Sequence, residues 1–422
     1  MASAPALLET KETKALPLDR STVERFGLER AEPEWLVASR TAAVDRYSPE
    51  AWPTGAEEEW RRFPLADLPR GPLVGATAET IYRAGREVLV GDLALLARSE
   101  EAAVRPWVSA APAAASVPGT HVAFEALAGA LWSAGSFCRI PAGLVADAPI
   151  QITRTWQPGA AAALSRTIIV AERDSHATVV EELASEGDEP RLAIPALEIH
   201  LAAGASLRYV RIQRFGTAVW DLGPQRYDSG RDSEIASFNV IVGSGRSKIS
   251  VESGMTGDGA NVKLYGLVAA DGTQRIDINS LQRVDGKGSN SDLLYLSALY
   301  GASKAVFYGL IRVEATSSGT GSYQECRNML LSDKAGADPI PVLEILTNDV
   351  ARCGHGATAG ALEDTELFYV MSRGLTRSDA ERLLVRGFFQ RVIDRLPDVE
   401  VREAILAALA PRIGRIAELD AA

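Results

Sequence analysis

The sequence predicts a mainly β protein with a β-helix core and α-helical regions before and after it. In the middle of the chain, short runs of Val, Ile, Leu, Tyr and Thr alternate with polar residues, as they do in β-strands. Turn residues separate those runs at a regular spacing, and helical periodicity with breakers returns at both ends. We therefore expect an N-terminal helical region at 1–115, a β-helix core at 116–360 and a C-terminal helical region at 361–422.

The N-terminal region is predicted to contain short helices separated by breakers. Proline is favoured in a first helical turn, and the pattern after Pro33 predicts a helix that runs to Val44. Another helix is predicted over Thr77–Leu96. We interpret the charged run Glu57–Arg62 as a solvated helix face in preference to a binding site. The Ala- and Pro-rich stretch 110–118 indicates a loop or linker.

The spacing of turn residues in the core favours a β-helix over a sandwich or a barrel. Gly259, Gly272, Gly286 and Gly301 follow one another at nearly equal intervals, and the interval from Ser175 to Gly204 is close to twice as long. These intervals exceed those of a sandwich, which usually shows turn signals every ~8–12 residues. The coils of a β-helix stack and share one continuous core. Typical strand-like runs are Arg166–Val170, Leu207–Ile212, Phe238–Val242 and Val262–Leu267.

The C-terminal region is predicted to be helical. Thr376 can cap a helix, and it forms a capping-box-like pair with Asp379. Pro397 is expected to end that helix, and further helices are expected at Glu400–Ala410 and Ile413–Leu419. The first helix carries one apolar stripe, which either docks on the protein's own core or forms part of a partner surface. The stripe consists of Ala380, Leu383, Leu384, Phe388, Val392 and Leu396.

Composition excludes several classes of protein. With 422 residues, 46% hydrophobic and 23% charged, the chain is unlike collagen, a disordered protein or a disulfide scaffold. The net charge of −11 argues against nucleic-acid binding along the whole surface, because phosphate contacts need clustered Lys and Arg. Three widely spaced cysteines indicate a reducing compartment. The first residues lack a secretory pattern and no apolar run is long enough to span a bilayer, so we expect a cytoplasmic protein.

Motifs of nucleotide-binding and hydrolytic enzymes are missing from the sequence. The P-loop pattern and the dinucleotide fingerprint both fail on spacing, the nearest candidate being Gly243–Lys248. The nucleophile elbow G-x-S-x-G and the zinc motif H-E-x-x-H are also missing. We therefore predict that the chain is not an enzyme, and that any ATP dependence comes from another chain.

The segment Cys353-Gly354-His355 is a candidate metal site. If the segment is extended, residues i and i+2 point to the same side, and sulfur and imidazole form a ligand pair suited to Fe or Zn. Such a pair also arises by coincidence. Structural zinc and iron–sulfur sites normally need about four ligands, so a second chain would have to complete the shell. The other three histidines, His121, His176 and His200, are expected to be surface or satisfied core residues.

A longer string of residues, from Phe307 to Gly374, resembles a known family. Its elements are Phe307-Tyr-Gly-Leu-Ile-Arg-Val313, Gln324-x-x-x-Asn328-x-Leu-Leu-Ser-Asp333, Pro341-x-Leu-Glu-Ile345, Asn348-Asp-Val350, Cys353-Gly-His-Gly-Ala-Thr-x-Gly360 and Leu367-Phe-Tyr-x-x-Ser-Arg-Gly374. This string resembles the SufB/SufD family of iron–sulfur cluster assembly proteins. Two N-terminal elements, Glu34-Trp-Leu36 and Glu57-Glu-Glu-Trp-Arg-Arg62, resemble the SufD branch in particular.

The resemblance implies a fold and a set of partners. It implies a right-handed parallel β-helix and a non-catalytic scaffold subunit that pairs with SufB and binds the SufC ATPase at its C-terminal helices. It also implies a role for His355 at the SufB–SufD interface, with Cys353 as a second candidate ligand. Iron or an iron–sulfur cluster would be held transiently and shared with the partner, and ATP would be bound by the partner only. An exposed β-helix edge would favour a homodimer of the isolated chain.

Two other functions stay open from the sequence. A carbohydrate-active enzyme on a β-helix, such as a polysaccharide lyase, would need clustered acidic and basic residues. The comparable cluster consists of Asp221, Arg226, Asp228, Arg231 and Asp232, which we interpret as a solvated loop. A SufB-like scaffold that itself accepts sulfur would use Cys138, Cys326 or Cys353.

Overall fold

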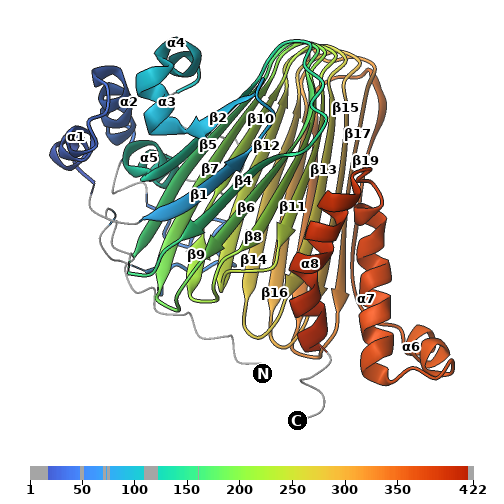
Figure 1. The fold of residues 1–422 in the computed structure, drawn as a ribbon. Coiled ribbons are helices and arrows are strands. Elements are labelled where there is room, and N and C mark those ends of the chain that lie inside the picture. The colour runs from blue at the N-terminus through green and yellow to red at the C-terminus, as the bar shows by residue number, and fades with distance from the viewer. Residues whose placement is uncertain are drawn as a thin grey trace.

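The computed structural model describes residues 18–47, 52–69, 73, 77–108, 122–159 and 161–416. Over these ranges the chain forms a parallel β-solenoid of about eight turns with helices on both sides of it in sequence (Figure 1). From β3 onward the strands alternate between two sheets, except that β9 and β10 belong to the same one, so each turn contributes one main strand to each sheet. The predicted β-helix with flanking helices is confirmed.

The strands of the described ranges form a nine-stranded sheet A and a ten-stranded sheet B, parallel except at one end. Sheet A contains, in spatial order, β1 (Ala78–Arg83), β4 (Ile150–Trp156), β6 (His176–Ser185), β8 (Ser206–Arg214), β11 (Glu234–Ile241), β13 (Asn261–Ala270), β15 (Asn290–Leu299), β17 (Thr320–Leu330) and β19 (Val350–Ala361). Sheet B contains β18 (Gly336–Ile345), β16 (Lys304–Val313), β14 (Arg275–Val284), β12 (Arg246–Met255), β10 (Pro224–Ser229), β7 (Arg191–Leu201), β5 (Ala162–Ala171), β3 (Ala134–Ile140) and β2 (Leu89–Asp92), with β9 (Val219–Asp221) beside β7 and β12. The two antiparallel pairs are β1 with β4 and β2 with β3.

The helices lie at the two ends of the sequence. The N-terminal ones are α1 (Arg20–Glu29), α2 (Glu34–Val44), α3 (Leu93–Ser99), α4 (Glu101–Val104), the 3₁₀ turn η2 (Arg105–Trp107) and α5 (Val122–Leu131). The C-terminal ones are α6 (Asp364–Met371), α7 (Arg377–Ile393) and α8 (Val399–Ile416). The oxygen Oγ1 of Thr376 accepts a hydrogen bond from the Asp379 amide at 3.1 Å, which confirms the predicted cap of α7.

One turn of the solenoid is about twice the glycine spacing seen in the sequence. Arg275 pairs with Arg246, and Lys304 pairs with Arg275, so equal steps along the chain separate equivalent positions in successive turns. Gly259 lies in the bend from β12 to β13, whereas Gly272 lies in the bend from β13 to β14. The glycine spacing therefore marks half a turn, with one bend at each side of a flattened coil.

A repeated backbone conformation keeps successive turns in step. In the described chain, seven bends that lead from sheet B to sheet A each contain one residue with a φ between 53° and 71°. The amide of each donates to a carbonyl oxygen in the following turn at 2.8–3.1 Å. Gly and Asp tolerate this left-handed conformation best, which explains why they occupy the column. Its members are Gly143, Asp174, Gly204, Asp232, Gly259, Gly288 and Gly319; Gly286 is not among them.

Three apolar layers hold the solenoid and the helices together. The inward side chains of the two sheets form the central core, which includes Ile152, Leu264 and Phe307. The N-terminal segments pack on the outer face of sheet B, and α7 and α8 pack on the outer face of sheet A (Figure 1). Strand β5 is buried over its whole length because both of its faces are covered.

Three sequence predictions about helices are wrong. The span Thr77–Leu96 forms β1, β2 and the start of α3, because its alternating residues pair with the first turn of the solenoid. The run Glu57–Arg62 forms turns closed by backbone hydrogen bonds to the Glu57 carbonyl oxygen, and Arg61 and Arg62 form ion pairs with Glu58. Helix α8 continues through Pro411, since its buried face on sheet A outweighs the ~3 kcal/mol that an internal proline costs. Residues 417–419, predicted as helical, lie outside the described residues.

A fully buried charged cluster sits inside the solenoid, between the two sheets. The Glu181 carboxylate accepts hydrogen bonds from Thr167 at 2.6 Å, Tyr209 at 2.5 Å and Arg211 at 3.0 Å. The Arg154 guanidinium lies 3.5 Å from the same carboxylate. Burial alone would raise the pKa of Glu181, but the two guanidiniums and the hydrogen bonds outweigh it and lower the pKa below its ordinary value.

Candidate functional site

The C-terminal end of the solenoid leaves two strands with one free edge each. In the part of the chain that the structure describes, β19 pairs with β17 alone and β18 pairs with β16 alone in the sheet ladders. An edge strand presents unpaired N–H and C=O groups and is a natural template for another chain. Both sheets are therefore available for extension at this end.

Cys353 and His355 lie on β19 and face the space between the sheets. Cys353 is in register with Ser322 and His355 is in register with Gln324, and both of these β17 side chains are buried. Alternate residues of a strand share a face, so the thiol and the imidazole continue two inward columns of sheet A. Cys353 is half-buried against the central core, whereas His355 is exposed. The i, i+2 arrangement expected from the sequence is thus present.

The glycines around His355 flatten the outer face of β19. A Cβ on Gly354 would meet the Tyr323 ring at 3.6 Å, and a Cβ on Gly356 would meet the Tyr323 hydroxyl at 3.1 Å. The Arg352 guanidinium lies over the same ring, 5.4 Å from its centre. The pattern C-G-H-G thus combines two inward donors with an outer face that accepts an aromatic ring.

The donor set is too small to hold a metal ion by itself. Among the residues that the structure describes, no three His, Cys, Asp or Glu side chains are grouped so that they could hold one. A closed zinc or iron–sulfur shell normally has about four ligands. Burial raises the pKa of the Cys353 thiol, so a bound cation or a cationic partner would be needed to favour its thiolate.

The other two cysteines are buried in the core. Burial raises the pKa of Cys138 to about 12. The pKa of Cys326 is also raised to about 12 by burial, against a weak hydrogen bond from Asn328. Both thiols are therefore neutral near pH 7, and they pack as small apolar side chains.

Gln324 is a buried polar residue next to His355 that the sequence did not single out as a site residue. Its amide nitrogen donates to the carbonyl oxygens of Gly309 at 3.0 Å and Val342 at 3.4 Å, so it bridges the two sheets. Its amide oxygen is buried and has no partner in the described structure. A Cβ on Gly309 would lie 2.3 Å from that oxygen, which explains the glycine. The sequence contained Gln324 within a recognisable motif. Its position beside His355 follows only from the pairing register of β17 with β19.

The remaining histidines do not join this site. His176 lies at the start of β6, and His200 places Nδ1 at 3.2 Å from an Asp228 carboxylate oxygen. His121 lies outside the described residues. The acidic and basic cluster weighed for a lyase is divided: Asp221 is buried and accepts from Gln213, and Asp228 is engaged by His200 and by Arg226. The paired Arg231 and Asp232 are exposed.

A known family matches the part of the chain that contains this site. The family model for the SUF system FeS cluster assembly, SufBD core domain, matches residues 154–388, more than half of the chain. The chain belongs to the SufBD family. It is 33% identical over 187 residues to an iron–sulfur cluster assembly SufBD family protein of Mycobacterium tuberculosis, which covers 43% of this chain and 47% of the relative. The aligned part thus spans about half the length of that relative.

Other SufBD relatives align over longer stretches. The iron–sulfur cluster assembly protein SufD of Bacillus subtilis is 28% identical over 291 residues, 68% of this chain and 66% of the relative. A SufBD family protein of Pyrococcus horikoshii is 27% identical over 285 residues, 67% of this chain and 63% of the relative. No helix in the described ranges is both long and apolar enough to cross a membrane.

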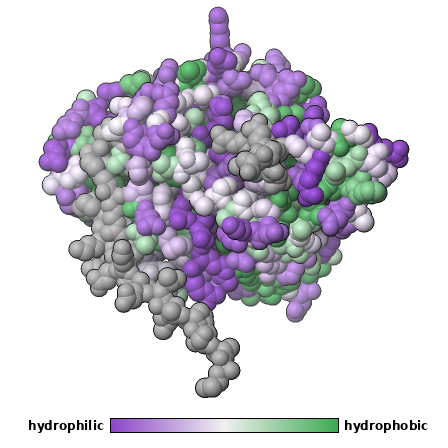
Figure 2. All heavy atoms as spheres, turned by 90° about the horizontal axis from the view of Figure 1, so that it is seen from below, coloured by the Kyte–Doolittle hydropathy of each residue, from purple (hydrophilic) through white to green (hydrophobic). Residues whose placement is uncertain are grey.

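The C-terminal helices of this SufBD protein expose apolar residues beside basic ones. A groove of about 550 Å³ between α7 and α8 is lined by Arg382, Leu383, Arg386, Leu406, Ala410 and Ile413. On α6, Phe368 is 73% exposed and Tyr369 is 60% exposed. Figure 2 shows apolar residues gathered on the right of the face seen from below, the side on which α6 lies in Figure 1. The apolar stripe predicted on α7 therefore has two parts. Val392 packs on sheet A, as part of the protein's own core, whereas Leu383 lines the groove between α7 and α8.

Proposed function

We propose that this chain is the SufD-type scaffold subunit of a Suf complex, without catalytic turnover of its own. It pairs with a SufB-type subunit and with the SufC ATPase, and it contributes to iron acquisition at the interface with SufB. The observation that carries this proposal is the position of His355 and Cys353. They face the interior of the solenoid on the last described strand of sheet A, where the site is incomplete.

The free edges of β18 and β19 are the surface proposed for SufB. A second solenoid that pairs there would extend both sheets and would bring its own end residues next to His355. Two donors come from this chain, and the remaining ligands of an iron ion or a cluster come from the partner. The iron–sulfur cluster would then be assembled at the interface between the two chains, and neither chain would assemble it alone.

The helices α6, α7 and α8 are the surface proposed for SufC. The groove between α7 and α8 combines Leu383 and Leu406 with Arg382 and Arg386, which suits an apolar anchor next to acidic side chains. Because the sequence lacks a P-loop, ATP is bound by the SufC partner only. Association of two ATPases would pull on α7 and α8 and rearrange the interface at β19, which would expose His355 where the SufB-type partner covers it in the complex.

Several observations support a SufD-type role over a SufB-type role. The Bacillus subtilis relative that aligns over 68% of this chain carries the name SufD. The thiols of Cys138 and Cys326 are buried and neutral, so they are poor acceptors of sulfur. Persulfide mapping by mass spectrometry after incubation with a cysteine desulfurase tests this assignment. We expect no persulfide on these two cysteines, and a stoichiometric persulfide on any cysteine of this chain would favour the SufB-type role.

The metal role of His355 is tested by co-expression with SufB and SufC. We expect His355→Ala to leave the mass of the complex unchanged in native mass spectrometry but to lower its iron content and cluster yield. His176→Ala is the matched control, because His176 is also exposed on sheet A but lies at the start of β6. Loss of SufB from the His355 variant would show a structural role, and equal iron contents in both variants would refute the metal role.

The ATP-driven step has a separate test. Cysteines introduced near His355 on this chain and on the partner are expected to cross-link faster with ATP than without it. Identical rates would argue against movement of the edge at β19.

A further inference from the structure

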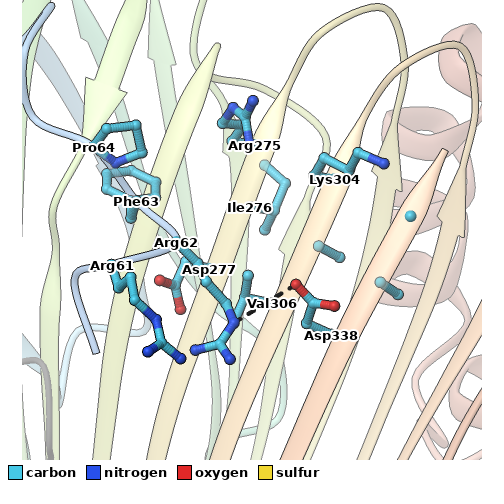
Figure 3. A pocket seen from close by; sticks show the side chains of 13 residues that line it. Arg61, Arg62, Phe63, Pro64, Arg275, Ile276, Asp277, Lys304, Val306 and Asp338 are labelled. Atoms are coloured by element: carbon cyan, nitrogen blue, oxygen red, sulfur yellow. Dashed lines mark ion pairs between the residues drawn. The ribbon is translucent and has the colours of Figure 1, made fainter. Parts of the chain in front are cut away.

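A second pocket lies on the outer face of sheet B, whereas the helices α7 and α8 pack on the outer face of sheet A. It has a volume of about 390 Å³ and lies between residues 61–64 and the strands β14, β16 and β18 (Figure 3). Small-molecule sites typically measure ~300–1,000 Å³. The N-terminal segment is held there by a hydrogen bond of 2.8 Å from the Lys248 ammonium to the Glu59 carbonyl oxygen. The pocket is therefore built by two distant parts of the chain.

A row of cations in register crosses this sheet, and two of its members, Arg275 and Lys304, line the pocket. Arg246, Arg275 and Lys304 occupy equivalent positions on β12, β14 and β16, and the next position on β18 is Gly336. Neighbouring strands are ~4.8 Å apart, so the row brings like charges close together, which is unfavourable without a counter-ion. The pKa of Arg246 is lowered by burial and by the neighbouring Arg275. Gly336 makes room for Lys304, whose Nζ would lie 2.5 Å from a Cβ there.

The carboxylates in the pocket do not neutralise this row. Asp277 lies 2.6 Å from the Lys248 ammonium, and both side chains are buried. Asp338 lies 3.7 Å from Arg62. In the described part of the chain neither Arg275 nor Lys304 has an ion-pair partner. A chain with a net charge of −11 thus keeps two uncompensated cations side by side in a pocket.

A second pair of cations lies at the opposite end of the pocket. Figure 3 shows Arg61 and Arg62 at one end and Arg275 and Lys304 at the other. Arg61 and Arg62 share the Glu58 carboxylate at 2.9 Å and 2.7 Å, and Arg62 also lies 3.7 Å from Asp338, so this end of the pocket is closer to charge balance than the end at Arg275 and Lys304. The Val306 side chain contributes apolar surface between the two ends.

We propose that this pocket binds a small phosphate-bearing polyanion. Arg275 and Lys304 hold one anionic group, and Arg61 and Arg62 hold the other end. Guanidinium groups match phosphate oxygens with paired hydrogen bonds, and an ammonium adds a mobile point charge. The site lies outside the surfaces proposed for SufB and SufC, except that the lining residues Gly336, Ala337 and Asp338 belong to β18. It does not depend on the scaffold role.

The test uses inorganic pyrophosphate and the full-length chain. Isothermal titration calorimetry at low salt is expected to show one site per chain, and pyrophosphate is expected to raise the Tm because it binds the folded state. The double variant Arg275→Gln, Lys304→Gln is expected to weaken binding at least tenfold. Lys287→Gln is the matched control, because it removes a positive charge from an exposed position in a bend and is expected to change the affinity less than twofold.

Each other outcome overturns the proposal. If neither variant differs from the parent, or if the control weakens binding as much as the double variant, the pocket is not a site. Tighter binding of citrate than of pyrophosphate would assign the pocket to carboxylates, and tighter binding of an Asp- and Glu-rich peptide would assign it to a protein partner. If the double variant does not fold by circular dichroism, Lys304→Gln alone carries the test, since Lys304 is exposed.

Discussion

The buried Glu181 cluster gives a sharp prediction about stability. Glu181→Gln keeps the shape of the side chain but removes its charge, so the guanidiniums of Arg154 and Arg211 lose their common counter-charge inside the core. Both arginines are almost completely buried and cannot be hydrated without opening the solenoid. Breaking one partner out of a buried ion pair costs about 3–5 kcal/mol. We expect a loss of that size in the free energy of unfolding at pH 7.

Urea unfolding followed by circular dichroism measures this loss. Glu182→Gln is the matched control, because it makes the same chemical change at the next position along the strand, on the outer face, where Glu182 pairs with a half-exposed Arg214. Exposed pairs of that kind contribute about 0–1 kcal/mol. A loss below about 1 kcal/mol for Glu181→Gln, or an equal loss for both variants, would refute the reasoning.

The dependence of this loss on pH follows from the lowered pKa of Glu181. The stability that the carboxylate contributes is fully present above its unfolded pKa of ~4.3, and it is lost as the pH falls through the lower pKa of the folded state. The difference between parent and Glu181→Gln should therefore be constant from pH 7 to pH 5 and shrink in more acidic solution. A difference that grows on acidification would contradict the assignment.

Two other predictions follow from packing and burial. Gly309→Ala would place a Cβ 2.3 Å from the Gln324 amide oxygen and 2.6 Å from the Phe307 ring, so urea unfolding should show a loss of about 1–3 kcal/mol from overpacking, and an unchanged free energy of unfolding would count against the packing described. Brief treatment of the native chain with iodoacetamide should alkylate the half-buried Cys353 before the other two cysteines, as measured by peptide mass spectrometry; prompt labelling of the buried Cys326 would contradict its burial.

The sequence predicted the solenoid because its bends need special residues at a fixed interval. Gly259 and Gly272 mark the two sides of one coil, and only the observed pairing shows that a full turn is twice that interval. The inside and outside of strands such as β5 could not be predicted, because a strand covered on both faces shows no alternation. Likewise β1 and β2 depend on partner strands that lie far along the chain, beyond α3 and α5.

The candidate site was predicted only in part. The i, i+2 spacing of Cys353 and His355 was visible, because it needs nothing more than an extended segment. The neighbour Gln324 lies one solenoid turn before His355, and its place beside the imidazole follows from the register of β17 and β19. Lys304 carried no signal in the sequence, since the cationic row appears only when three strands are aligned.

The two ends of the solenoid differ in a way that limits how far such chains can polymerise. At the N-terminal end the short antiparallel strands β1 and β2 cover the first turn, and β1 exposes the charged residues Glu79 and Arg83. Such a border discourages a further parallel coil from joining. Two solenoids that meet through their open ends would leave only covered ends outside. In a pair of that kind, growth would stop at two chains and would not continue into a fibre.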